Sequence, residues 1–174
     1  MDFIPSSQFD IEIDKLTNSI ENAQTGEVFD TEVTKLTIQN TNEIKKTLWL
    51  FDWKLELLDK SKEVFKLTTT NNPNVIHGLL SIQNMGDHIF AHLIESAKFN
   101  RGEFKLYLGV PGNLMAFACK EAFEKGYGGY VAFDSKTALV NHYIKTLGAT
   151  HFRGQRMYIE TNAAYNLVNR YFNR

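Results

Sequence analysis

The apolar pattern is strongest in residues 107–126, where hydrophobic residues recur at helical spacing. One row consists of Leu114, Phe117, Ala118 and Ala122, and a second row of Met115, Cys119 and Phe123 lies beside it, so polar residues have only a narrow flank. Glycines and a proline precede these rows, and Gly126 follows them. The pattern predicts a mostly buried helix over 112–125 that begins at a glycine-marked turn.

Runs of β-branched and alternating apolar residues predict strands at 29–37, 63–70, 75–83, 88–97 and 129–134, and a hairpin at 151–160. Short polar turns join the strands between 63 and 97, which favours an antiparallel meander. The strand, helix, strand order around 112–125 favours one parallel pairing. The chain is therefore expected to form a mixed sheet.

Four further helices are expected. Residues 41–60 carry the stripe Ile44, Leu48, Phe51, Leu55 and Leu58, and residues 14–22 form a weaker amphipathic stretch. A helix capped by Ser135 and closed by Gly148 follows the strand at 129–134, and residues 161–172, capped by Thr161 or Asn162, close the chain. Residues 1–10 are expected to be a lead-in with little fixed structure.

Composition narrows the classes of protein. The 174 residues are 43% hydrophobic, with a formal net charge of −1 and one cysteine. We expect one domain over 1–174, with 1–28 as lead-in and short helix. The charge gives no basic field for nucleic acid, so a tRNA-type substrate would need a local patch. No intramolecular disulfide is possible, and with no secretion signal or membrane-length apolar run the expected location is the cytoplasm.

The turn before the central helix has its own candidate chemistry. A glycine turn that enters a helix leaves backbone N–H groups free at the positive end of the helix dipole, where phosphate binds. The glycines Gly109 and Gly112 permit close approach of a ligand, whereas Pro111 has no N–H to donate. The alternative is a tight strand-to-helix turn without a ligand.

This order of elements resembles the GNAT N-acetyltransferase superfamily. The resemblance rests on the turn Gly109-Val-Pro-Gly-Asn-Leu114 and on the second helix at 137–149, which carries a tyrosine before Leu147-Gly148. It departs from the family at Leu106, where Arg or Gln is usual, and at Pro111, which replaces the second glycine. It implies an α+β fold with a mixed, mostly antiparallel twisted sheet of about six to seven strands, flanked by helices on both faces.

The resemblance also implies acetyl-CoA as co-substrate, no metal, and direct attack by an amine. The turn residues expected to bind the coenzyme are Leu108, Gly109, Val110, Gly112, Asn113 and Leu114. In the family, the thioester carbonyl and pantetheine arm lie where the fourth and fifth strands splay apart, which corresponds here to 88–97 and 131–134. The acceptor is expected to be a small-molecule or peptide amine.

Two catalytic roles follow. Glu95 is the candidate general base, with His92 as rival; three residues apart, they face opposite sides of a regular strand unless a bulge intervenes. Tyr143 is the candidate acid for the departing thiolate, although it stands five residues before Gly148 where the family has four. The alternative for Tyr143 is a packed core tyrosine.

Trp49 and Trp53 are candidate substrate-binding residues, and their alternative is a wider core stripe. The histidines have no ligand spacing suited to a metal, and Cys119 is expected to be an inert buried thiol. The aromatic end of 161–172 is compatible with a homodimer contact. The rival to an N-acetyltransferase is a catalytically degenerate GNAT-fold module that binds CoA or another protein.

Overall fold

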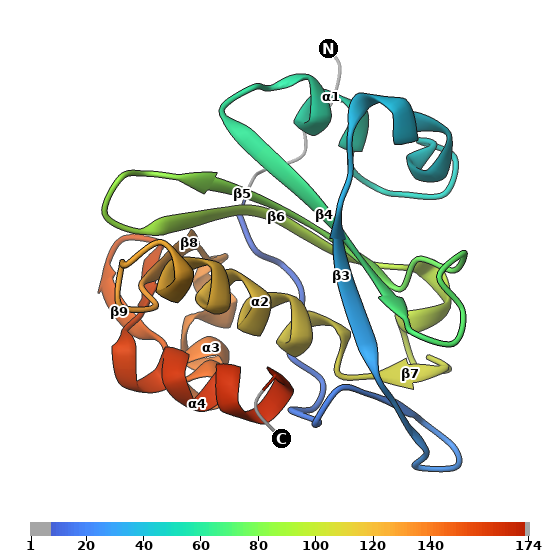
Figure 1. Ribbon diagram of the computed structural model, residues 1–174. Helices are drawn as coiled ribbons and strands as arrows, with labels where there is room; N and C mark the ends of the chain where they lie inside the picture. The colour runs from blue at the N-terminus through green and yellow to red at the C-terminus, as the bar shows by residue number, and fades with distance from the viewer. Residues whose placement is uncertain (1–7, 173–174) are drawn as a thin grey trace.

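The structure is a computed structural model that describes residues 8–172. Its main feature is a seven-stranded mixed sheet in the order β3-β4-β5-β6-β8-β10-β9 (Figure 1). Among the strands of this sheet, within residues 8–172, β6 and β8 are the one pair that runs parallel. The strands are β3 (Thr31–Lys35), β4 (Lys62–Thr69), β5 (Gly78–Asn84), β6 (Ile89–Ser96), β8 (Val131–Asp134), β9 (Thr150–Arg153) and β10 (Arg156–Ile159). This confirms the predicted fold class and the predicted meander.

A second, three-stranded sheet lies beside the first. It consists of β2 (Val28–Phe29), β1 (Ile20–Asn22) and β7 (Tyr107–Leu108), all paired antiparallel in the order β2-β1-β7. Strand β7 leads directly into the central helix. The small sheet therefore fixes the position where that helix begins.

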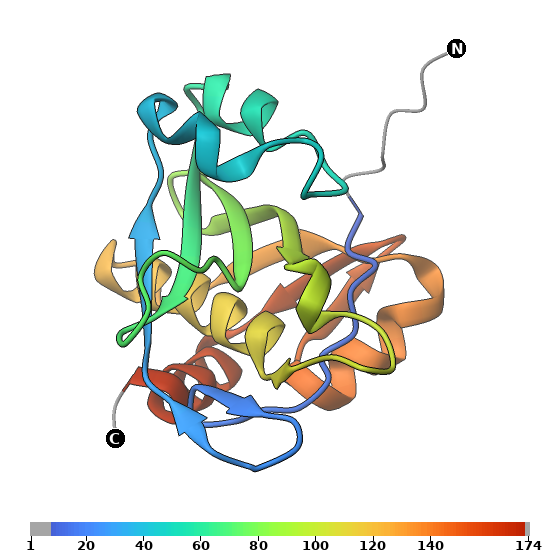
Figure 2. The same cartoon turned by 90° about the vertical axis from the view of Figure 1, so that its right-hand side faces the viewer.

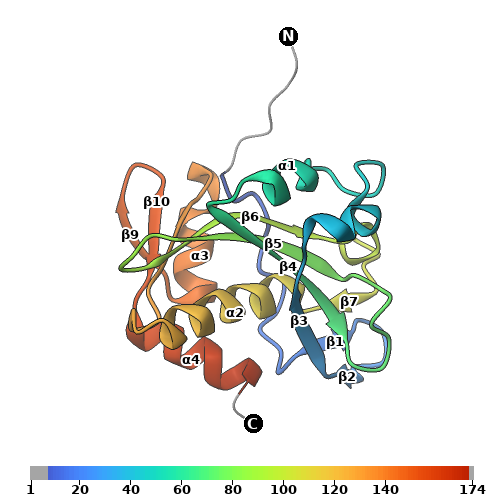
Figure 3. The same cartoon turned by 45° about the horizontal axis from the view of Figure 1, so that its top comes forward.

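Helices cover both faces of the main sheet, as Figure 3 shows. On one side, α2 (Val110–Glu124) packs on β5 and β6 and is backed by α4 (Thr161–Phe172), with α3 (Val140–Leu147) beside β8. On the other side lie the 3₁₀ helix η1 (Ile38–Ile44) and α1 (Trp53–Leu58). Two further 3₁₀ turns are η2 (Lys98–Asn100) and η3 (Thr137–Leu139). Each face has its own core cluster.

Helix α2 is held close to the sheet by glycines. Its N-cap, Gly109, has a φ of +94°, a left-handed conformation that favours glycine. A Cβ on Gly78 of β5 would lie 2.7 Å from a methyl group of Val110, so only glycine allows this approach. The predicted buried helix and its glycine-marked start are both confirmed.

The single helix predicted over 41–60 is wrong. The chain forms η1, then an irregular stretch, then the short helix α1. Leu48 and Leu55 from the predicted stripe are 60% and 63% exposed, whereas Trp49 and Trp53 are buried in their place. The large indoles remove more apolar area from water than the leucines would, and the chain bends to bury them.

The helix predicted over 14–22 is also wrong. Residues 8–17 run extended through the molecule, and residues 20–22 are β1. Phe9, Ile11 and Ile13 alternate with acidic residues, which is a period of two and not of 3.6. The lead-in proposed for 1–10 is therefore ordered from residue 8, and its residues 1–7 lie outside the described part of the chain.

The remaining helices agree with the sequence except at their caps. Helix α3 ends at Gly148 in the left-handed conformation, as predicted, but its N-cap is Leu139 and not Ser135. Helix α4 begins at Thr161, whose hydroxyl donates to the Gly128 carbonyl. Within residues 8–172 no helix has the length and apolar character needed to cross a bilayer.

Candidate functional site

The candidate site is the gap between β6 and β8. These two strands pair over only two residue pairs, at Ile89 and Phe90, although β6 continues to Ser96. Residues 8–17, here called the cleft segment, run through this gap; Figure 2 shows the blue segment descending between the green strands and the orange elements. The segment is attached to β8, because the Phe9 amide donates to the Asp134 carbonyl and the Lys136 amide donates to the Phe9 carbonyl.

Further along, the cleft segment is bonded to α3. The Tyr143 hydroxyl donates to the Ile11 carbonyl, and the Ile13 amide donates to Nε2 of His142 at 2.8 Å. Phe9 and Ile13 are buried in the main core, where Phe9 stacks on Phe133. The apolar side of the segment is thus part of the core, and its backbone is held by polar groups.

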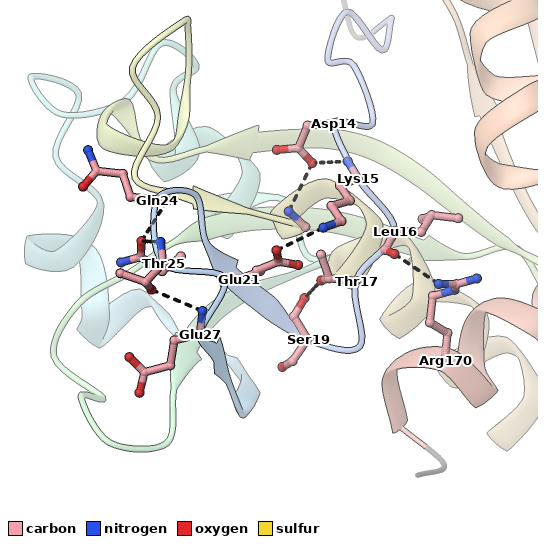
Figure 4. Close-up of polar contacts among 12 residues, drawn as sticks. Asp14, Lys15, Leu16, Thr17, Ser19, Glu21, Gln24, Thr25, Glu27 and Arg170 are labelled. Atoms are coloured by element: carbon pink, nitrogen blue, oxygen red, sulfur yellow. Dashed lines mark hydrogen bonds and ion pairs between the residues drawn. The ribbon is translucent and has the colours of Figure 1, made fainter.

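At the turn before α2, the cleft segment supplies an anion. The Asp14 carboxylate accepts a hydrogen bond from the Gly109 amide at 3.1 Å and pairs with the Lys105 ammonium at 3.2 Å. This is the position in which a helix N-terminus binds a negatively charged group. Beyond it, the Lys15–Glu21 ion pair and the bond from Arg170 to the Leu16 carbonyl fasten the segment at its end (Figure 4).

The turn predicted to bind the coenzyme is covered. Gly109, Val110, Gly112, Asn113 and Leu114 are buried, and Leu108 is half-buried. A Cβ on Gly112 would lie 2.5 Å from the Tyr171 hydroxyl, whose oxygen accepts a hydrogen bond from the Thr17 amide. Tyr171 and the cleft segment therefore close the turn from outside.

Two cavities remain in the gap, on the side toward β6. One, of about 150 Å³, is lined by the start of the cleft segment, by Leu50 and Phe51, and by residues 93–96 with Arg101. The other, of about 340 Å³, extends from there to Lys105 and Pro111. Both are lined by Asp10, Ile11, Ser96 and Arg101, so they lie next to each other along the segment and are here together called the groove.

Glu95 lines the smaller cavity, but its carboxylate is already partnered. It accepts hydrogen bonds from the Leu50 amide at 2.8 Å, the Phe51 amide at 3.1 Å and the Trp53 indole at 2.9 Å. The residue is 3% exposed, and an Arg101 nitrogen lies 3.9 Å away. Glu95 thus anchors the irregular stretch before α1, a role that the sequence did not indicate.

Tyr143 is fully buried and its ring packs against Phe9 of the cleft segment and Phe133 of β8. Burial raises the pKa of its hydroxyl well above the usual value. Its bond to the Ile11 carbonyl means that the hydroxyl points into the gap between β6 and β8. In the conformation described, that hydroxyl is occupied by the chain itself.

Comparisons with known proteins give structural matches only. No protein-family model and no curated protein sequence matches the chain. The crystal structure of AtaTR bound with AcCoA matches with a TM-score of 0.51 and 14% identity, over 79% of this chain and 98% of that chain. A chimera of spermidine N-acetyltransferase SpeG from Vibrio cholerae and hSSAT matches with a TM-score of 0.48 and 12% identity, over 79% of this chain and 99% of that chain.

The AtaTR match extends over most of both chains. The chain has the GNAT fold. The strands that the sequence resemblance expected to splay apart correspond to β6 and β8, which pair only at Ile89 and Phe90, and α2 follows β7 as expected. The predicted order of elements around the site is therefore confirmed.

The rival base, His92, lies at a bulge in this GNAT fold. Strand β6 pairs Ala91 with Ile82 and Leu93 with Ser81, so His92 is the extra residue. The bulge brings His92 to the α1 side of the sheet, the side on which Glu95 reaches Trp53. Nε2 of His92 lies 2.7 Å from the Gln83 side-chain oxygen, burial lowers its pKa, and neither groove cavity is lined by it.

Trp49 and Trp53 belong to the core cluster under η1 and α1. Trp53 has no exposed surface, so it cannot touch a substrate in this structure. Trp49, at 7% exposed, lines a separate pocket together with Leu48 and Phe99. The core alternative considered for both tryptophans describes their positions.

The other candidate ligands are scattered. Within the described residues 8–172, no three His, Cys, Asp or Glu side chains are grouped to hold a metal ion. Cys119 is fully buried in α2, and burial raises the pKa of its thiol. Cys119 does not line either groove cavity.

Three groups of the site were not identified from sequence: Asp14, Arg101 and Lys105. Asp14 belongs to the run Phe-Asp-Ile-Glu-Ile-Asp over 9–14, whose strict alternation is the signature of a half-buried strand. That signal was available but is only six residues long. Arg101 and Lys105 have no pattern around them, and only the fold brings them to the groove.

Proposed function

We propose that this chain is an N-acetyltransferase, which moves the acetyl group of acetyl-CoA to an amine. The observation that carries the proposal is the gap between β6 and β8, which ends at the N-terminus of α2. Backbone groups of Asp134 and Lys136 on one wall are set to pair with an extended ligand that contains amides, as pantetheine does. The Gly109 amide at the far end is set to receive a phosphate. AtaTR, which shares the fold, was crystallised with AcCoA.

In this proposal the turn 108–114 receives the pyrophosphate and the cationic side chains on the groove contribute charge. Gly109 supplies its N–H, while Pro111 supplies none. Arg101 and Lys105 line the larger cavity and attract the phosphates. Their contribution compensates for the missing contact at Pro111.

The reaction is direct. A neutral amine nitrogen forms a bond to the thioester carbonyl carbon, the carbon–sulfur bond then breaks, and the sulfur leaves as thiolate. Tyr143 donates a proton to this thiolate once its hydroxyl is free of Ile11. The proton lost by the amine goes to Glu95 through water, because a carboxylate has about four acceptor sites and three are used by Leu50, Phe51 and Trp53.

The acceptor is a small-molecule or peptide amine that reaches the smaller cavity. The structure favours Leu50 and Phe51 over the two tryptophans as its contacts, since both line this cavity. Leu50 is 68% exposed, so an incoming amine can pack against it before it reaches Glu95.

A second candidate function is a GNAT-fold module without acetyl transfer. The observation that favours it is the covering of the coenzyme turn by Asp14, Thr17 and Tyr171. In that case the cleft segment is a permanent part of the core, and acetyl-CoA has no site.

Calorimetric titration with acetyl-CoA and a thiol-release assay with a panel of amines test the proposal. Tyr143→Phe is expected to lower kcat at least tenfold with a smaller effect on the Kd for acetyl-CoA, and Tyr165→Phe, on the exposed face of α4, is the matched control. If neither the folded wild type nor Asp14→Ala binds acetyl-CoA, the acetyltransferase proposal is wrong and the second candidate, a GNAT-fold module without acetyl transfer, remains.

A further inference from the structure

We infer that the cleft segment, residues 8–17, is an internal competitor of the coenzyme, so that the site is closed by the chain itself. This inference rests on the proposed function and names its regulation. In the closed state the segment occupies the gap between β6 and β8. Acetyl-CoA binds only after the segment, including its start at Phe9 and Asp10, has left that gap.

The first argument is that the segment uses the groups a coenzyme would use. Phe9 pairs with the edge of β8 as an added strand does. The Ile11 carbonyl accepts a hydrogen bond from the Tyr143 hydroxyl, and the Asp14 carboxylate accepts one from the Gly109 amide. The segment therefore presents backbone amides followed by a carboxylate, and CoA has the same order of groups, since the amides of pantetheine are followed by the pyrophosphate.

The second argument is that the segment fills the gap incompletely. The two groove cavities, of about 150 and 340 Å³, lie between it and β6. Within the described residues, the buried side-chain polar atoms without a hydrogen-bond partner are Asn100 Oδ1, Arg101 Nε and Asn113 Oδ1. Asn100 and Arg101 line the larger cavity, and Asn113 belongs to the turn. Buried polar atoms are normally partnered, so the closed state leaves groups that a ligand would satisfy.

The third argument concerns how the segment is fastened. Its Asp10–Lys136 ion pair is exposed on both sides, at 59% and 45%, and such pairs contribute little. The apolar anchors Phe9 and Ile13 are buried, so release of the whole segment is costly. The open state is therefore a minor population, and the apparent Kd for acetyl-CoA is raised by the reciprocal of that population.

A reversible crosslink tests the inference. Phe9 and Ser135 are bridged in parallel register, so their successors Asp10 and Lys136 are neighbours, and adjacent strands lie about 4.8 Å apart, within disulfide reach. Both residues are exposed, so Asp10→Cys with Lys136→Cys leaves the core unchanged, and Cys119 is buried away from them. The oxidised protein is expected to bind acetyl-CoA at least tenfold more weakly than the same protein after reduction.

A second variant opens the segment. Asp14→Ala frees the Gly109 amide and Lys105, and we expect acetyl-CoA to bind about tenfold more tightly than to wild type. Glu12→Ala is the control, because Glu12 lines the same cavity but, among residues 8–172, has no hydrogen bond or ion pair to the turn 108–114. Trypsin cleavage after Lys15 reports the release directly and is expected to accelerate when acetyl-CoA is added.

The outcomes are distinct. Equal binding by oxidised and reduced protein would overturn the inference and leave the proposed function standing. Binding by the reduced protein or by Asp14→Ala, with loss on oxidation, supports the inference. No binding by wild type, by either form of the crosslink variant or by Asp14→Ala would remove the proposed function and the inference together.

Discussion

The Gly109 amide donates a hydrogen bond to the Asp14 carboxylate at 3.1 Å, although the two residues lie 95 positions apart in sequence. Because Asp14 also pairs with Lys105, one carboxylate joins the cleft segment to the start of α2 and to the loop before it. The same contact that closes the site therefore stabilises the fold around it.

Substitution of Asp14 is expected to lower the stability of the fold, an effect that can be measured without acetyl-CoA. Asp14→Ala should lower the free energy of unfolding by about 1–2 kcal/mol, because the Gly109 amide loses a charge-assisted bond. Asp14→Asn keeps an acceptor oxygen and should cost less. Urea denaturation measures both, with the exposed Glu103→Ala as control. An Asp14→Ala protein as stable as wild type would show that the bond contributes nothing.

Glu95 is expected to matter for stability before it matters for chemistry. Glu95→Ala leaves the Leu50 and Phe51 amides and the Trp53 indole without acceptors, and should cost about 3–4 kcal/mol. Trp53→Phe removes one of these donors. Since both changes affect the same bond, the double variant should be less destabilised than the sum of the two singles. Additive losses in denaturation experiments would contradict the anchoring role.

Gly112 and Tyr171 form a second testable pair. Gly112→Ala places a methyl group 2.5 Å from the Tyr171 hydroxyl, and we expect a loss of about 1–3 kcal/mol. Tyr171→Phe alone loses the bond to the Thr17 amide, about 1 kcal/mol. In combination, Tyr171→Phe should recover part of the loss caused by Gly112→Ala. Thermal unfolding of wild type, the two single variants and the double variant gives the coupling energy. The double variant must be less destabilised than the sum of the two single variants.

His77 predicts a dependence of stability on pH. Burial lowers its pKa from 6.5 to about 4, and Nδ1 lies 3.0 Å from the Asn100 amide nitrogen. The unfolded chain therefore binds more protons between pH 4 and 6.5, so stability from this residue is full above pH 6.5 and falls as pH decreases toward 4. The loss is on the order of 2 kcal/mol.

The measurement for His77 is urea denaturation at several pH values. His77→Gln has no titrating ring, so its stability should change less with pH across that window than that of wild type. His151→Gln, at an exposed position, is the matched control and should follow wild type. Identical slopes for His77→Gln and wild type would refute the assignment.

Cys119 should be unreactive in the folded protein. Its thiol is fully buried and its pKa is raised by burial, so the thiolate that alkylating reagents attack is scarce. Alkylation by iodoacetamide should proceed at the rate of unfolding and should accelerate when urea is added. Rapid modification of native protein would show that α2 opens locally.

The sequence predicted the fold where pattern and burial agree. The helix α2 and the strands β4, β5, β6 and β8 carry clear periodicities that the core then satisfies. Residues 41–60 also have a helical period, but Trp49 and Trp53 compete with Leu48 and Leu55 for the core. The buried Trp53 indole donates a hydrogen bond to the Glu95 carboxylate, 42 positions away, and such a partner cannot be identified from the local pattern.

The candidate site was harder to predict because its decisive contacts are nonlocal. The turn 108–114 and Tyr143 were located by motif, and both do border the gap. Asp14 accepts a hydrogen bond from the turn, and Ile11 accepts one from the Tyr143 hydroxyl. In both pairs the partners lie more than 90 positions apart in sequence. Local periodicity contains no information on such pairings.

The long separations also set an order of assembly during synthesis. Residues 9–17 leave the ribosome well before their partners Gly109, Asp134, Tyr143 and Tyr171 have been made. Strands β4 to β6 can pair in the meantime, since they are neighbours in sequence. The first contacts of the cleft segment, at Phe9, need the chain only as far as Lys136, whereas its last contact, at Thr17, needs Tyr171 of α4. The segment therefore docks progressively as the chain is made, starting at β8 and finishing at α4.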